Sequence, residues 1–374
     1  MKTDSLDKSK WELTTFGEVA IQQKENVDIE TTHLDRYIAG EHMSSEDLHI
    51  RQWGTVGDGY LGPAFIRKFQ RGDILYGSRR TYLKKVVVAD FDGITSNTTF
   101  VIKANSKKIL PELLPFIMLS DNFTEHSIKH SKGSVNPYIN WKDIANYEFL
   151  LPPKEEQVRL AELFWAVDEV VERNLEVRDE LKNFRKLYFE TFHFGKELNH
   201  RLTDCLVTKK KKSKPPHQTK RYVGLEHIES GEFTTNNYST SHDILADSFF
   251  FKKGDLLYSK LRPYLDKAIM TDFDGICTTE LIVYDTNSLA KKKYILNLLH
   301  SKSFLNYIVT KGFGTKMPRV SHEIVSDYEF YLPEINVQEK ILEKLNEILA
   351  IEQQLTRYIL KTQQLKSALI NQIF

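Results

Sequence analysis

The sequence has little of what zinc proteins, membrane proteins and secreted proteins usually show. Only two of the 374 residues are cysteines, Cys205 and Cys277, which are too few for a tetrahedral thiolate zinc site. No apolar run approaches the roughly 18 residues that a membrane-spanning helix needs. The first residues, Met1 to Ser5, are not followed by the apolar stretch of a secretory signal. We therefore expect a cytoplasmic chain with two ordinary thiols.

An excess of charge of one sign is also missing. Lysine and arginine number 52 against 51 aspartate and glutamate residues, so the net charge of +1 does not by itself indicate a nucleic-acid partner. The 41% of hydrophobic residues is enough to form cores rather than a disordered chain. A length of 374 residues exceeds one typical domain, and we expect at least two.

Catalytic motifs are absent or incomplete. The sequence contains neither a phosphate-binding G-x-x-x-x-G-K-[ST] loop nor a G-x-S-x-G nucleophile elbow. Gly57 to Gly62 matches G-x-G-x-x-G, but Pro63 follows where a helix should begin, which favours a turn. Asn136-Pro137-Tyr138 is similar to the Asn-Pro-Pro-Tyr motif of adenine methyltransferases but lacks one proline. His126 and His130 have no glutamate between them. We expect no catalytic residue, no bound metal and no cofactor in this chain.

An internal repeat is the strongest positive signal. Residues 72–94 and 254–276 are identical at thirteen of 23 positions without a gap. Two further pairs of segments follow in the same order and at nearly the same offset, 36–43 with 221–228 and 147–152 with 328–333. Three such anchors predict two copies of one structural unit.

Each copy changes character part-way. The first part is rich in aromatic and β-branched residues with glycine turns, and predicts short strands such as Leu83 to Ala89 and Phe249 to Phe251. After Pro152-Pro153 and after Pro333 the pattern becomes glycine-free and helical, with early acidic residues that suit a helix start.

Both predicted helices have apolar residues at alternating three- and four-residue steps, which is typical of the contact line of a coiled coil. The first line comprises Leu160, Leu163, Val167, Val170, Asn174, Val177, Leu181, Phe184 and Tyr188. The second comprises Ile341, Leu345, Ile348, Glu352, Leu355, Tyr358, Thr362, Leu365 and Leu369. Asn174 either fixes the register of the pair or is merely tolerated there, and both interpretations stay open.

The predicted fold is α+β, with two tandem globular recognition domains that are each followed by a long helix. We expect the helices to pair as an antiparallel coiled coil with internal pseudo-twofold symmetry. The predicted segments are 1–152 for the first domain, 153–195 for the central helix, 196–333 for the second domain and 334–374 for the C-terminal helix.

Basic residues gather around the repeated Gly-Asp turn in both copies, which favours a shared ligand over chance. They are Arg67, Lys68, Arg71, Arg79, Arg80, Lys84 and Lys85 in the first copy, and Lys252, Lys253, Lys260, Arg262 and Lys267 in the second. The run Lys209 to Lys212, without an equivalent run in the first copy, is either a mobile solvated loop or a phosphate contact. Mixed cations, amides and glycines before each helix suit base-edge contacts, although ordinary loops have the same composition.

These residues together resemble one family. The Tyr147-Glu148-Phe149-x-Leu151-Pro152-Pro153 pattern with Glu156-Gln157 and a long helix after it, the Gly72 and Gly254 turns, and Gly133-Ser134 with Ile139-Asn140 resemble specificity subunits of type I restriction-modification systems. The second copy departs slightly, with Val337-Gln338-Glu339 at the helix start. The resemblance covers nearly the whole chain, including its duplicated order.

The resemblance implies a non-catalytic subunit that recognises double-stranded DNA. Each domain would read one half of a split target, and the helices would set the unread gap. It also implies two modification subunits that use S-adenosylmethionine, docked on the helices, and restriction subunits that use ATP and magnesium. The outward residues Glu169, Glu172, Arg173 and Glu176 are either that docking surface or simply solvated.

We predict DNA contacts at Arg79, Arg80, Tyr82, Lys84, Lys132, Ser134, Asn136 and Tyr138 for one half-site. For the other we predict Lys209, Lys210, Lys211, Lys260, Arg262, Tyr264, Lys316, Arg319 and His322. Two alternatives are a stand-alone DNA methyltransferase or nuclease, which would bind S-adenosylmethionine itself, and a coiled-coil scaffold for proteins, whose affinity for DNA would not depend on salt.

Overall fold

The computed structural model describes residues 7–314 and 317–374. The chain forms two compact units, and each takes part of both long helices: unit 1 comprises residues up to Asn174 together with Tyr358–Phe374, and unit 2 comprises Leu175–Arg357. Among the described residues, no helix combines the length and the apolar character that crossing a membrane requires.

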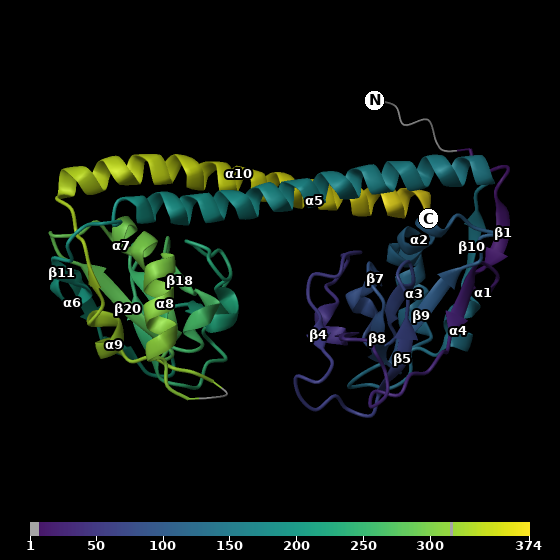
Figure 1. The fold of residues 1–374 in the computed structure, drawn as a ribbon, viewed down its shortest axis with the longest axis horizontal. Coiled ribbons are helices and arrows are strands. Elements are labelled where there is room, and N and C mark those ends of the chain that lie inside the picture. Colours follow the sequence, from purple (N-terminus) through teal and green to yellow (C-terminus); the bar gives the residue numbers. More distant parts are fainter. Residues whose placement is uncertain (1–6, 315–316) are drawn as a thin grey trace. The chain divides into compact units, whose positions relative to one another are not determined.

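Unit 1 contains three small sheets and a group of short helices, which Figure 1 shows as ribbons. Its strands are β1 (Glu12–Thr15), β2 (Ala20–Gln23), β3 (Arg36–Ile38), β4 (Gly54–Thr55), β5 (Phe65–Phe69), β6 (Ile74–Gly77), β7 (Val86–Val88), β8 (Gly93–Ser96), β9 (Thr99–Ala104) and β10 (Glu148–Leu151). Its helices are α1 (Phe16–Val19), α2 (Leu114–Leu119), α3 (Asp121–Lys129), α4 (Trp141–Ala145) and the first part of α5 (Lys154–Thr191), with 3-10 turns η1 (Gly40–His42), η2 (Thr81–Leu83) and η3 (Pro111–Leu113).

The central sheet of unit 1, in the order β2-β9-β6-β7, has a hydrophobic core on each face. Alternation along β6 places Ile74 and Tyr76 in the core shared with the helices, whereas Leu75 belongs to the core shared with the second sheet, β4-β3-β8-β5. The third sheet pairs β1 with β10, which leads directly into α5. Because both faces are buried, β6 is apolar at three successive positions.

Unit 2 repeats this construction with other residues. Its strands are β11 (His200–Arg201), β12 (Leu206–Lys209), β13 (Lys212–Ser213), β14 (Arg221–Val223), β15 (Ser239–Thr240), β16 (Ser248–Phe251), β17 (Leu256–Ser259), β18 (Ala268–Met270), β19 (Gly275–Thr278), β20 (Leu281–Thr286) and β21 (Glu329–Phe330). Its helices are α6 (Leu202–Cys205), α7 (Lys292–Leu299), α8 (Lys302–Lys311), α9 (His322–Ser326) and the first part of α10 (Ile335–Ile373), with 3-10 turns η4 (Leu225–His227) and η5 (Pro263–Leu265).

The strand orders of the two units correspond. The sheet β12-β20-β17-β18 matches β2-β9-β6-β7, and β13-β16-β19-β14-β15 matches β5-β8-β3-β4 with one edge strand more. Leu257 again belongs to the second core while Leu256 and Tyr258 belong to the core shared with the helices. The predicted α+β class and the duplication of one unit are confirmed. The predicted strand at Leu83 begins only at Val86, because Lys84 has a left-handed conformation.

Both long helices begin with the same anchor. The side chain of Gln157 accepts a hydrogen bond from the backbone N–H of Leu110 and donates one to the carbonyl of Pro152. Gln338 does the same with Lys291 and Pro333. Each buried amide thus satisfies backbone groups at the helix start and ties the helix to the loop before the short helices.

Within each unit, α5 and α10 pair in antiparallel directions. In unit 1, Phe164 lies against Phe374, and one turn later Asp168 bonds Lys366. In unit 2, Phe189 shares a core with Leu345, and Arg185 bonds Glu352. Residue numbers therefore rise on α5 as they fall on α10 in both units. The predicted pairing of two long helices is confirmed within each unit.

The predicted contact line of α5 is largely wrong by one position. Leu163, Val170, Val177 and Phe184 are exposed, whereas the next residues, Phe164, Val171, Phe189 and the charged Asp168 and Arg185, are buried. On α10 the prediction is correct from Ile341 to Glu352 but fails at Tyr358 and Leu365, which are exposed next to buried Ile359 and Lys366. The buried contact line of α5 includes the charged residues Asp168 and Arg185. Hydrophobic periodicity therefore indicated the adjacent, more apolar line of residues, which is exposed. Asn174 bonds the carbonyl of Val170 in its own helix, which favours the interpretation that it is locally tolerated.

Candidate nucleic-acid interface

An arginine in the left-handed conformation marks the same turn in both units. Arg80 precedes η2 with φ of 50°, and Arg262 precedes η5 with φ of 50°. The backbone N–H of Arg80 donates to Pro137, and that of Arg262 to Pro318, both at 2.7 Å. The left-handed conformation is unfavourable for a residue with a side chain. Its presence in both units therefore indicates a turn of fixed geometry, which sets the direction of the arginine side chain.

The proline carbonyls belong to a hairpin within the segment of mixed cations, amides and glycines that precedes each long helix. In unit 1, Lys132 and Tyr138 exchange two backbone hydrogen bonds of 2.8 and 2.9 Å, and Arg79 forms a bridge with Tyr138. In unit 2, Phe313 and Arg319 pair in the same way, next to Leu261. The structure therefore brings the predicted residues of the turn and of the hairpin together in each unit.

Several predicted residues present their side chains to solvent on this face. In unit 1 they are Arg79, Arg80, Tyr82, Lys132, Ser134, Asn136 and Tyr138. In unit 2, Tyr264 is 52% exposed, close to the 53% of Tyr82 at the equivalent position of η2. An exposed aromatic ring beside an arginine offers a stacking surface and a cation at one place. Lys316 lies outside the described residues.

Lys84 has a structural role. Its side chain is buried, and its ammonium bonds Asp121 and Glu46. Burial alone would lower its pKa, but the bonds to both carboxylates prevail and raise it. Unit 2 has Asp266 at this position, where it bonds Lys186 and His300. We therefore leave Lys84 out of the DNA contacts that we propose.

The lysine run follows a backbone path that also exists in unit 1. The Phe250 N–H donates to Lys211, as the Lys68 N–H donates to Glu25, so residues 209–212 correspond to residues 23–26. The run thus has a structural counterpart, although its charges do not, and it forms the end of β12 and the edge strand β13 rather than a long loop. Lys209 bonds Asp255 at 2.6 Å and Asp285 at 2.8 Å, and Lys211 lies over Phe250.

Lys210 and Lys260 line a cavity of about 580 Å³ in unit 2, together with Lys212 and Arg319. Its lining also includes the apolar residues Phe249, Leu281 and Val283. His322 lies at the same cavity, but its ring bonds Tyr284 and Thr208 at 2.9 and 3.0 Å. Burial lowers the pKa of His322, which favours the neutral ring. We expect it to orient its neighbours and not to bind a phosphate as a cation.

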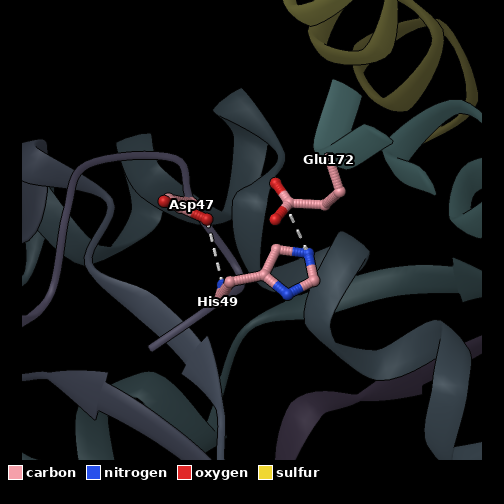
Figure 2. Close-up of side chains that lie close together, drawn as sticks. All are labelled: Asp47, His49 and Glu172. Carbon is pink, nitrogen blue, oxygen red and sulfur yellow. Dashed lines mark hydrogen bonds and ion pairs between the residues drawn. The ribbon is translucent and has the colours of Figure 1, made fainter. Parts of the chain in front are cut away.

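A second cluster, which the sequence analysis missed, lies where unit 1 meets its helices. Asp47 and His49 on a loop approach Glu172 of α5, with ligand atoms within 4.8 Å of one another (Figure 2). Such a group resembles a metal site, but the guanidinium of Arg51 bonds both carboxylates, Asp47 at 2.5 Å and Glu172 at 2.6 Å. The cation of this cluster is therefore the arginine.

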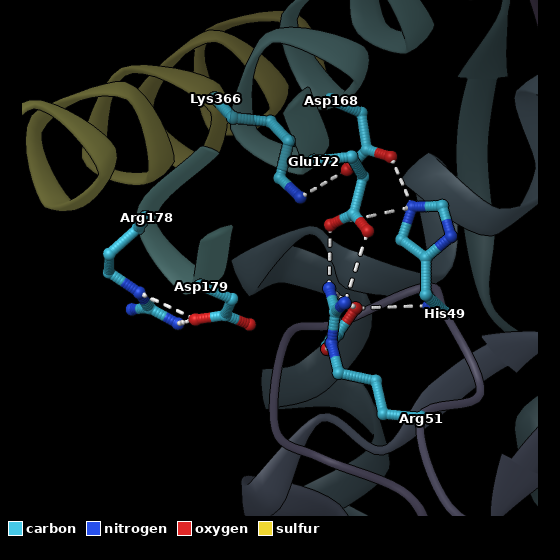
Figure 3. A network of polar contacts seen from close by, with 8 residues as sticks. His49, Arg51, Asp168, Glu172, Arg178, Asp179 and Lys366 are labelled. Atoms are coloured by element: carbon cyan, nitrogen blue, oxygen red, sulfur yellow. Dashed lines mark hydrogen bonds and ion pairs between the residues drawn. The ribbon is translucent and has the colours of Figure 1, made fainter. Parts of the chain in front are cut away.

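The cluster continues into the helix pair (Figure 3). Asp168 accepts one hydrogen bond from Lys366 of α10 and shares a 2.7 Å contact with His49. Burial alone would raise the pKa of Asp168, yet His49 and Lys366 hold it below its ordinary value, and the contact with Asp168 raises the pKa of His49. Glu172 is thus engaged within the unit, and Glu169 pairs with Arg173 on its own helix. No repeat or motif in the sequence indicated this network.

A family model for the type I restriction modification DNA specificity domain matches residues 11–183 and 200–362. The chain belongs to this family. It carries the domain twice, in agreement with the two units of the structure, and the predicted membership of the type I specificity family is confirmed.

Curated relatives and a solved structure agree with this family. The specificity subunit of type I restriction enzyme EcoDI from Escherichia coli is 22% identical over 294 residues, which cover 66% of each chain. That of HindI from Haemophilus influenzae (strain ATCC 51907 / DSM 11121 / KW20 / Rd) is 27% identical over 192 residues, 49% of this chain and 41% of the relative. A chain solved in work on assembly and conformational transition of the type I R-M system has a TM-score of 0.52 at 20% identity, with 97% of both chains covered, which shows a common fold. The match thus spans just under two thirds of the first relative.

Proposed function

We propose that this chain is the specificity subunit of a type I restriction-modification complex and that each unit reads one half of a bipartite double-stranded DNA target. The observation that carries the proposal is the repeated turn, in which Arg80 and Arg262 have the same left-handed conformation and the same 2.7 Å bond to a proline carbonyl. Two equivalent but chemically different surfaces suit two different half-sites.

Separate replacement of the two arginines tests this proposal. Arg80→Ala should weaken binding to one half of the target and Arg262→Ala to the other, by roughly ten-fold each, because an arginine contact to a base is worth about 1–3 kcal/mol. Affinity would be measured with half-site substitutions in the DNA at fixed salt, on the chain complexed with its modification subunits. Arg173→Ala, on the exposed face of α5, is the control. An equal loss on random DNA from both variants would contradict the proposal.

We further propose that α5 and α10 set the gap between the half-sites. Four residues inserted at the boundaries of the units, after Asn174 and after Arg357, add about one helical turn or ~6 Å. The preferred gap should then grow by about two base pairs, at ~3.4 Å each. The same insertion after Gly195, outside both helices, should leave it unchanged. Methylation mapping gives the gap, and an unchanged gap in the helix variant would refute the spacer.

The modification subunits are proposed to dock on the exposed apolar residues of α5. These are Leu163 and Val170 in unit 1 and Val177, Phe184 and Leu187 in unit 2. Leu163, Val170, Val177 and Phe184 recur at seven-residue steps, and apolar side chains with this spacing offer a second contact line for a partner helix. Val170→Asp should weaken co-purification of the modification subunit, whereas Arg173→Asp, one turn away, should not. Equal retention by both variants would exclude this surface.

In this proposal S-adenosylmethionine belongs to the modification subunits, and ATP and magnesium belong to the restriction subunits of a cytoplasmic complex. The dependence of DNA affinity on salt distinguishes this proposal from the alternative of a protein-binding scaffold. DNA affinity should fall steeply with ionic strength if the cations of these surfaces bind phosphates.

A further inference from the structure

Arg319 of unit 2 has an unusually well-fixed backbone. Its N–H and carbonyl are both bonded to Phe313, at 2.9 and 3.0 Å, and it forms a bridge with Leu261. The next residue, Val320, donates to the carbonyl of Lys260 at 3.0 Å. The Cα of Arg319 is thus held from two sides, by its own hairpin and by the segment that leads to Arg262.

Its side chain is held as well. The guanidinium donates from Nε and from one terminal nitrogen to the two carboxylate oxygens of Glu280, each at 3.3 Å. Glu280 lies between β19 and β20, and its carbonyl accepts a bond from the Lys260 N–H at 3.0 Å. Since a guanidinium has five N–H donors, this side-on contact leaves the end of the fork free. Both side chains are accessible, 48% and 32% exposed.

The surroundings favour a nucleic-acid ligand. Lys210, Lys212 and Lys260 line the same cavity as Arg319 and Glu280, so cations suited to phosphates flank the pair. A carboxylate among these cations would weaken binding that depended on charge alone. A direct role in base recognition accounts for its presence, because a carboxylate that orients an arginine makes its donors directional.

Building on the proposed function, we propose that Arg319 reads a guanine in the half-site of unit 2 and that Glu280 is the positioning residue for its guanidinium. The end of an arginine fork matches guanine O6 and N7 in the major groove, and no other base presents two acceptors there. Because Glu280 binds the Nε side of the guanidinium, the guanidinium of Arg319 is already oriented before it contacts the guanine.

Unit 1 has different chemistry at the equivalent places. Tyr138 occupies the position of Arg319, with the same pair of bridges, and Thr98 occupies that of Glu280, because the Ser78 N–H donates to Thr98 as the Lys260 N–H donates to Glu280. The guanine contact therefore belongs to one half-site only.

The experiment uses the full chain in complex with its modification subunits. The wild-type recognition motif is obtained from methylated sites in cells and then tested by binding to DNAs with single base-pair changes. Arg319→Lys should reduce discrimination at one G·C pair of the unit 2 half-site about ten- to a hundred-fold and leave the other positions unchanged. Glu280→Gln should reduce it at the same pair by a smaller factor, without changing the dependence of affinity on salt.

A matched pair in the same unit provides the control. Arg201 bonds Glu329 across β11 and β21 through the same two nitrogens, Nε and one terminal nitrogen, which here both donate to one carboxylate oxygen, and both residues are exposed. Arg201→Lys and Glu329→Gln should leave the motif unchanged, and equal melting temperatures would show that all four variants fold.

Uniform loss of affinity on all sequences for Arg319→Lys, with a shallower salt dependence, would make Arg319 a phosphate contact and overturn the proposal. If Glu280→Gln left the discrimination at this G·C pair unchanged, Glu280 would not be a positioning residue. A half-site for unit 2 without any G·C pair would also refute the guanine contact. If the wild-type complex had no bipartite preference at all, the proposed function itself would fail instead.

Discussion

Unit 1 and unit 2 join their helices with opposite arrangements of charge. In unit 1 the buried acid is on α5, where Asp168 meets Lys366, whereas in unit 2 the buried base is on α5, where Arg185 meets Glu352. Yet Arg185 and Lys366 occupy equivalent helix positions, because Gln157 and Gln338 anchor both helices alike. Both long helices therefore carry a cation at the same position relative to the anchoring glutamine. The position of the acidic partner on the other helix differs by about one turn between the units.

The same comparison applies to the globular parts. Lys84 and Asp266 have the same left-handed backbone with φ of 45° and 50°, but each is neutralised by neighbours of the opposite charge. The backbone geometry is thus the same in both units. The side chains differ, but where the charge at this position has changed sign, the residues that pair with it have changed sign as well. Such divergence lets one fold present two different binding surfaces.

Breaking the buried pair of unit 2 should have the largest effect. Arg185→Met leaves the carboxylate of Glu352 buried without a partner, and should lower the free energy of unfolding by about 3–5 kcal/mol in urea denaturation. The double variant Arg185→Met, Glu352→Leu removes both charges and should recover most of that loss. A double variant no more stable than the single one would show that the pair contributes through packing instead.

A glycine common to both units should give a smaller and equal effect. A Cβ on Gly93 would lie 2.6 Å from the ring of Phe69, and one on Gly275 would lie 2.6 Å from the ring of Phe251. Gly93→Ala and Gly275→Ala should each lower the free energy of unfolding by about 1–3 kcal/mol, since the rings must move within packed cores.

Gly40→Ala is the control for both, because no atom lies within 4 Å of the added Cβ. Clearly unequal losses at Gly93 and Gly275 would mean that the two second cores differ in their ability to adjust.

The smallest effect concerns pH, and its sign should differ between the units. The contact with Asp168 raises the pKa of His49, so this stabilisation is complete below pH ~6.5 and is lost as pH rises through the folded-state pKa. Burial lowers the pKa of His193 in unit 2, so its contribution is present above pH ~6.5 and is lost as pH falls through the folded-state value. The free energy of unfolding would be measured from pH 5 to 8. His49→Gln should remove its decrease at higher pH, and His193→Gln should remove its decrease at lower pH. The same pH profile in both variants would contradict this assignment.

The sequence was most informative where the repeat left identical residues. The Gly-Asp turns, the Pro-terminated strands and the two long helices follow from such anchors together with helix-start chemistry. The contact line of α5 could not be predicted, because Asp168 and Arg185 are charged and only tertiary partners 119 or more residues away make their burial favourable. For the same reason Lys84 and Lys209 looked like free cations: the carboxylates that bind them lie in other segments. The network of Asp47, His49 and Arg51 had no counterpart in the second copy from which to infer it.

The composition of unit 1 has a consequence for biosynthesis. Its first core includes Ile370, Ile373 and Phe374 as well as Leu160 and Phe164, so residues that leave the ribosome after all of unit 2 complete it. Unit 2 is continuous in sequence and can close while translation proceeds. The first core of unit 1 therefore stays incomplete, with apolar surface exposed, until residues 370–374 are synthesised. We expect the nascent first unit to be prone to aggregation during that time.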